Sequence, residues 1–108
     1  MKNLLDETIN ILSENGKTKN DIKWIGNSIK FINWDDFKLI ANRKYDDGFG
    51  WAEISEELLI VGDDFWLERN EYDGSEWWEF KTIPTKPDIK SNNQEDMIGI
   101  IFNHKKEK

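Results

Sequence analysis

The spacing of apolar and polar residues predicts an amphipathic helix near the start of the chain. Over residues 3–15, one helical face collects the side chains that recur every three or four positions: Leu4, Leu5, Thr8, Ile9 and Leu12. Asn3 is a suitable N-cap, and Gly16 suits the position just after the helix. A shorter apolar stripe that follows Asn33 predicts a second helix over residues 34–44.

Alternating patterns predict strands in two other regions. In residues 21–32, apolar and polar side chains alternate on both sides of a Gly-Asn-Ser turn, which indicates two strands joined by this turn. Residues 57–83 contain three apolar runs separated by short turns, and these predict a three-stranded antiparallel meander. The second turn is Asp73-Gly74, the strongest sequence signal for a two-residue hairpin.

The hairpin turn also predicts the strand register. A two-residue loop pairs Tyr72 with Ser75, and therefore Arg69 with Trp78. The same register gives one face of the meander the residues of a hydrophobic core: Leu58, Ile60, Phe65, Leu67, Trp78 and Phe80. Arg69 lies across from Trp78 on this face, where we expect a structural cation–π contact.

The opposite face, here called the outer face, is half apolar and half charged. Its predicted members are Leu59, Val61, Trp66, Glu68, Asn70, Tyr72, Trp77, Glu79 and Lys81. A solvated sheet face does not normally hold so many large apolar side chains. Either another element of the chain covers it, with a last strand predicted at residues 97–102 as the candidate, or a partner does.

These elements predict an α+β fold with two helices packed on one face of a small antiparallel sheet. We expect one domain over residues 1–102, with a polar loop or linker over 84–96. We expect the charged tail 103–108 to be disordered.

Composition excludes several classes of site. The 108 residues include no cysteine and one histidine, His104, which rules out disulfides, thiolate chemistry and multi-histidine metal sites. No apolar run approaches the ~18 residues of a membrane span. The N-terminus turns acidic too early for a signal peptide, so we expect a cytoplasmic protein.

Charge is concentrated in one part of the chain. The net charge is −7, and in residues 46–79 Arg69 is the only base among many acids. Such a segment does not suit direct binding of nucleic acid or of an anionic membrane surface, both of which require clustered Lys and Arg.

The hairpin resembles a known group of sequences. The run from Glu71 to Phe80, EYDGSEWWEF, together with Trp66-Leu67-Glu68-Arg69 and the Gly48-Phe49-Gly50 loop, is similar to small proteins encoded by bacteriophages and prophages. The group has no established activity, so no catalytic residue follows from the resemblance. It implies a bacterial cytoplasm and a gene type that often encodes small binders of host or phage proteins.

We predict a non-enzymatic protein–protein interaction module that docks a protein partner, or a second copy of itself, through the outer face. Large aromatic side chains and flanking carboxylates would form its binding surface: Trp66, Glu68, Tyr72, Trp77 and Glu79. No catalytic residue, metal ligand or cofactor is assigned.

Two alternatives stay open. An acidic surface that imitates a phosphate backbone could inhibit a nucleic-acid-binding protein; its candidate residues are Asp63, Asp64, Glu71, Asp73 and Glu76. The same Trp and Glu face could instead bind a sugar or hydrolyse one, because paired acids between two indoles suit glycoside chemistry.

Overall fold

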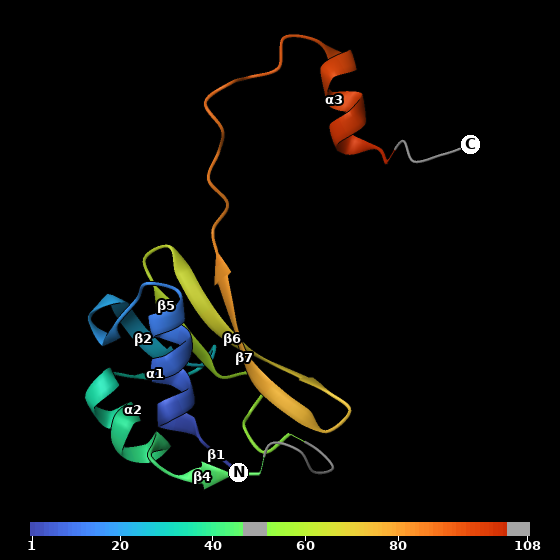
Figure 1. The fold of residues 1–108 in the computed structure, drawn as a ribbon. Coiled ribbons are helices and arrows are strands. Elements are labelled where there is room, and N and C mark those ends of the chain that lie inside the picture. Colours follow the sequence, from blue (N-terminus) through green and yellow to red (C-terminus); the bar gives the residue numbers. More distant parts are fainter. Residues whose placement is uncertain (47–51, 104–108) are drawn as a thin grey trace.

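The computed structural model describes residues 1–46 and 52–103, and it is built around a five-stranded antiparallel sheet with the strand order β3-β2-β5-β6-β7 (Figure 1). The strands of this sheet are β2 (Ile22–Gly26), β3 (Phe31–Ile32), β5 (Leu59–Gly62), β6 (Phe65–Tyr72) and β7 (Ser75–Thr82). Two short strands, β1 (Lys2–Asn3) and β4 (Lys44–Tyr45), pair separately. The chain combines three helices with sheets whose strands all pair antiparallel, so the predicted α+β class is confirmed.

Two helices begin where the sequence predicts them. Helix α1 (Leu4–Glu14) is capped by Asn3, whose Oδ1 accepts a hydrogen bond from Asp6 N at 3.0 Å. Helix α2 (Trp34–Ala41) is capped in the same way by Asn33. It ends before the predicted residue 44 because the chain leaves the helix to form β4 against β1. A 3₁₀ turn, η1 (Lys19–Asp21), connects α1 to β2.

The hairpin has the predicted register. Tyr72 pairs with Ser75, Arg69 with Trp78, and the pairing continues to the far end of both strands. Asp73 and Gly74 have φ values of 53° and 86°, as a tight turn with two left-handed residues requires. The predicted core face of the meander is therefore confirmed where β5, β6 and β7 pair.

Burial alternates along these strands. Over the middle of the strands, residues that point to the inner face are buried, apart from the half-buried Phe80, and their neighbours are half-buried or exposed. The buried core combines side chains of the strands, of α1 and of α2, and the inner face of the five-stranded sheet supplies half of them: Leu4, Leu12, Ile25, Phe37, Ala41, Tyr45, Ile60, Phe65, Leu67 and Trp78.

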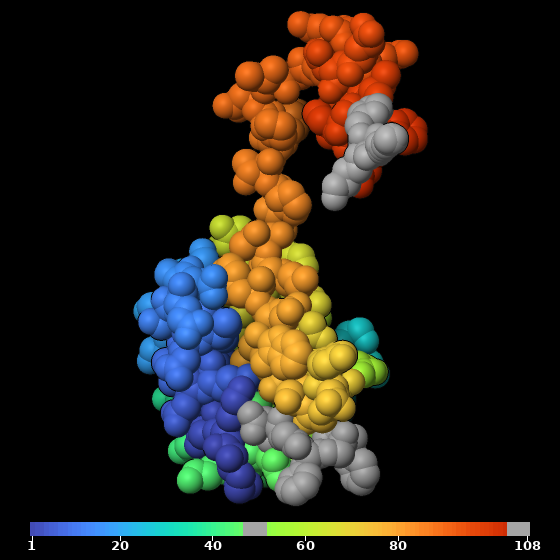
Figure 2. All heavy atoms as spheres, turned by 45° about the vertical axis from the view of Figure 1, so that its right-hand side comes forward, coloured from blue at the N-terminus to red at the C-terminus, as the bar shows by residue number. Residues whose placement is uncertain are grey.

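The predicted last strand is wrong. Residues 97–102 do not form a strand, and α3 (Gln94–Ile101) occupies most of this stretch and the end of the predicted loop 84–96. Asn93 caps it by accepting a hydrogen bond from Asp96 N at 2.9 Å, and Glu95 and Asp96 supply acids to its first turn. An unbroken apolar run is compatible with either structure, and here the N-cap outweighs it. Helix α3 lies apart from the sheet, at the end of an extended segment (Figures 1 and 2).

Two predicted features fall outside the described residues. These are most of the loop at 46–50 and the end of the tail at 104–108. Within residues 1–46 and 52–103, no helix is both long and apolar enough to cross a membrane.

Candidate functional site

The outer face is built from side chains that lie in rows across neighbouring strands. One row crosses four strands, from Trp24 on β2 through Val61 on β5 and Trp66 on β6 to Lys81 on β7. The next row crosses all five strands and contains Phe31, Gly26, Leu59, Glu68 and Glu79. A third row pairs Asn70 with Trp77. In contrast to the inner face, none of these side chains is fully buried. The face thus combines aromatic and aliphatic side chains with a pair of carboxylates, Glu68 and Glu79, which lies between the rows of Trp66 and Trp77.

The two tryptophans of the hairpin hold equivalent positions. Trp66 Nε1 donates to Glu68 Oε1 at 2.7 Å, two residues along the same strand. Trp77 on β7 likewise lies two residues before a glutamate, Glu79. The indole N–H of Trp66 is therefore satisfied within the protein, and its ring is held in place. An aromatic ring that is already held in place loses less conformational entropy when it binds.

The pKa of Glu79 is lowered from its ordinary value. The main cause is a hydrogen bond from Asn70, which outweighs a small opposing effect of burial; the bond to Trp77 and the charge of Lys81 lower the pKa further. Lys81 Nζ lies 3.5 Å from Glu79 Oε1. A glycoside-cleaving general acid needs a raised pKa, so Glu79 does not suit that role. Glu68 and Glu79 face each other across the strands as predicted.

The structure brings four of the five predicted docking residues together. Trp66, Glu68, Trp77 and Glu79 lie in adjacent rows at the middle of the hairpin. Tyr72 lies at the hairpin end beside the turn, where its side chain is 76% exposed. Trp24 was not among the predicted residues. The sequence shows that Trp24 and Ile22 lie on the same side of a strand. It does not show that Trp24 shares a row with Trp66, because this depends on the pairing of β2 with β5.

The five predicted decoy acids do not form one surface. Asp63 and Asp64 lie in the β5–β6 turn, where Lys23 and Lys17 approach them at 3.4 Å each. Glu71 and Asp73 are at the other end of β6, about 25 Å away for a strand of eight residues.

The prediction is wrong for Glu76, which is buried rather than on the acidic surface. Glu76 Oε1 accepts from Arg69 at 3.1 Å, and its two carboxylate oxygens also accept from the backbone N–H groups of Glu53 and Ile54 at 2.6 and 3.1 Å. Its charge is thus used inside the fold.

Glu76 belongs to a buried ionic cluster that connects α1, β4 and the hairpin. The Arg69 guanidinium donates to Glu7 at 3.2 Å, to Tyr45 Oη at 3.1 Å and to Glu76 at 3.1 Å. Tyr45 Oη also donates to Glu7. The guanidinium carbon lies 4.8 Å from the centre of the Trp78 ring, which confirms the predicted cation–π contact.

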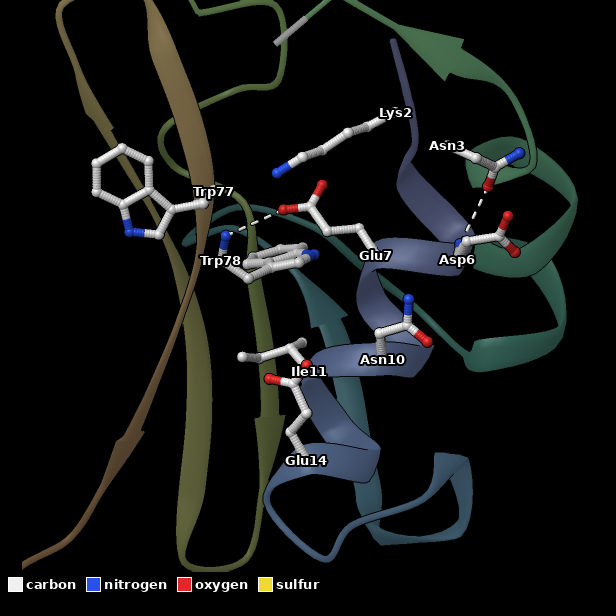
Figure 3. Close-up of a pocket in the computed structure, with 9 residues that line it drawn as sticks. All are labelled: Lys2, Asn3, Asp6, Glu7, Asn10, Ile11, Glu14, Trp77 and Trp78. Atoms are coloured by element: carbon white, nitrogen blue, oxygen red, sulfur yellow. Dashed lines mark hydrogen bonds between the residues drawn. The ribbon is translucent and has the colours of Figure 1, made fainter.

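Helix α1 is attached to β7 through the same cluster. Glu7 reaches from α1 to accept the backbone N–H of Trp78 at 3.2 Å, and Trp78 Nε1 donates to Thr8 at 2.8 Å. Figure 3 shows Glu7 directed at β7, with Trp78 on the side of α1 and Trp77 on the opposite side of the strand. These bonds hold the inner face of β7 against α1 and direct Trp77 to the outer face.

The titration of the cluster reflects its burial. Desolvation raises the pKa of the Tyr45 phenol, and its hydrogen bond to Glu7 adds to this, while Arg69 opposes it. Desolvation acts to lower the pKa of Arg69, but hydrogen bonds to Tyr45 and Glu76 and the charge of Glu7 outweigh it, so the pKa is raised. Arg69 stays charged and Tyr45 stays protonated at neutral pH, which suits a structural role.

Among the described residues, no group of three or more His, Asp or Glu side chains is arranged to hold a metal ion. No protein-family model, curated protein or solved structure matches the chain.

Proposed function

We propose that this protein is a non-enzymatic protein–protein interaction module that docks a partner through its outer face. The supporting observation is the aromatic strip of Trp24, Trp66 and Trp77, which stays only half-buried although the alternate residues of the same strands are fully buried. Trp and Tyr are enriched among residues that contribute most to binding energy. The setting we propose, from the hairpin resemblance, is a phage or prophage protein in a bacterial cytoplasm.

The proposal requires both α1 and α2 to cover the inner face. For α1 this is supported by the bond from Trp78 to Thr8 and by the burial of Leu12. For α2 it is supported by the burial of Phe37 and Ala41 in the same cluster as the inner-face strand residues. With both helices used on that side, the outer face is left as the place where a further surface can be buried.

The chemistry of the outer face fits a protein partner better than a sugar. The indole N–H of Trp66 is occupied by Glu68 of the same strand, so this ring offers apolar area rather than a hydrogen bond. Glu68 and Glu79 lie between the rows of Trp66 and Trp77, and Lys81 lies beside Glu79. Aromatic area combined with a few polar and charged groups is the usual composition of a protein interface.

The test is quantitative capture of partners by the tagged full chain, compared with Trp66→Ala/Trp77→Ala. The matched control is Leu39→Ala/Ile40→Ala, which removes two exposed apolar side chains of α2. All three proteins are first shown to be folded by circular dichroism, and capture is measured at low and high salt, because salt weakens charge-driven contacts but not aromatic docking.

We expect a partner, or a second copy of the chain, that is retained at high salt by the wild type and the control and lost by the tryptophan variant. Retention by the tryptophan variant would contradict the proposal. Loss at high salt in every protein would instead favour an acidic surface as the binding site.

A further inference from the structure

Helix α3 is an amphipathic element with nothing to pack on. Its apolar side chains include Met97, Ile98 and Ile101, which share one side at helical spacing, and Phe102 follows directly. No residue of α3 is buried, and Ile101 is 66% exposed. An isolated helix of eight residues is not stable in water, so α3 requires an apolar surface against which to form.

The outer face is an apolar surface of the sheet whose large side chains are only half-buried. It is wide enough for a short helix, since the row from Trp24 through Val61 to Trp66 crosses three strands. An amphipathic helix laid across a sheet is a common way to bury both apolar faces. The chain thus contains two unpartnered apolar faces of compatible type, one on the sheet and one on α3.

The segment between the sheet and α3 favours contact of α3 with a different molecule. Residues 83–93 contain Pro84 and Pro87 and no glycine, so the backbone is biased toward extended conformations and away from a tight reversal. Ten extended residues span up to about 33 Å. The radius of gyration is 18.6 Å, against about 13 Å for a compact chain of this length. Figure 2 shows the segment leading α3 away from the body.

From these observations we infer that the occupant of the outer face is α3 of a second copy, so that two chains exchange their C-terminal arms. The arrangement is closed and symmetric, because each chain offers one outer face and one α3. It places Ile98 and Ile101 of one copy over Trp66 and Val61 of the other. This inference rests on the proposed function, since it names the partner for the same face.

The first experiment measures the mass of the full chain by light scattering over a range of concentrations. We expect a dimer for the wild type and a monomer for Ile98→Asp/Ile101→Asp, which places charge on the apolar side of α3. The matched control is Ile89→Asp, at a position 87% exposed in the linker, and it should stay dimeric. A monomeric wild type, or a dimer that the α3 variant does not disturb, would overturn the inference.

The second experiment identifies which chain α3 contacts. Because the protein has no cysteine, single cysteines report specific contacts. Tagged Ile98→Cys is mixed with untagged Val61→Cys and oxidised, and we expect a disulfide between the two chains. Tagged Ile98→Cys mixed with Leu39→Cys, on the exposed side of α2, should give none. The double variant Val61→Cys/Ile98→Cys shows whether the bond instead forms within one chain.

A bond only within one chain would mean that α3 covers its own sheet, and would overturn the exchange. A dimer without the mixed disulfide would also overturn it, because the dimer would then use another surface. Either result leaves the proposed function intact if Trp66→Ala/Trp77→Ala still loses a captured partner. If that variant loses no partner, the proposed function fails as well.

Discussion

Arg69 is the side chain whose loss should cost the fold most, because it is the cation that neutralises two carboxylates inside the protein. Its side chain is 2% exposed, and those of Glu76 and Glu7 are 1% and 13% exposed. Arg69→Met keeps an apolar side chain of similar length in the space but removes the donors to Glu7, Tyr45 and Glu76. Both glutamates are then left without their cation.

Removing one partner of a buried ion pair typically costs about 3–5 kcal/mol. Two features place the cost of Arg69→Met toward the lower end of this range. Glu76 keeps the backbone donors of Glu53 and Ile54, and Glu7 is partly hydrated. We therefore expect a loss of about 3 kcal/mol in the free energy of unfolding, a large share of the roughly 5–15 kcal/mol available to a domain.

The assay is urea unfolding followed by far-UV circular dichroism, which does not depend on the fluorescence of Trp78 beside the mutation. The matched control is Lys38→Met, which removes an exposed cation 3.6 Å from Asp35 and should cost less than about 0.5 kcal/mol. The double variant Arg69→Met/Glu76→Gln should lose about 1–3 kcal/mol less than the sum of the single variants. Strict additivity, or an Arg69→Met protein as stable as the control, would refute the role of the cluster.

Two further predictions concern the pH response and the packing of the core. Burial raises the pKa of Tyr45, so the phenol loses its proton more readily when the chain is unfolded. The free energy of unfolding of the wild type should therefore fall as the pH rises above about 10. Unfolding curves at alkaline pH should show a smaller fall for Tyr45→Phe and an unchanged fall for the exposed control Tyr72→Phe. In Gly62→Ala the new methyl group would overlap the ring of Phe65, which should cost about 1–3 kcal/mol in urea unfolding, and an unchanged midpoint would contradict the packing.

The sequence was sufficient to predict the hairpin because its determinants are local. The Asp73-Gly74 turn defines the pairing, and alternation then assigns every side chain to one face. Helix α3 was missed because the apolar run 97–102 fits both the strand and the helix period, and only the cap at Asn93 distinguishes them.

The ionic cluster could have been predicted only in part. The register that puts Trp78 on the inner face also puts Glu76 there, so Glu76 could have been removed from the acidic surface and assigned to Arg69. The roles of Glu7 and Tyr45 could not be inferred in this way, because they come from distant segments that meet Arg69 only in the folded chain. The same limit applies to Trp24, whose contribution to the outer face depends on the pairing of β2 with β5.

The central claim is that Trp66 and Trp77 form a docking surface rather than part of the core. It is tested most directly by the capture of partners at high salt with the wild type and with a folded Trp66→Ala/Trp77→Ala variant. We predict that the wild type retains a partner, or a second copy of the chain, and that the variant retains neither. Equal capture by both proteins would contradict the claim.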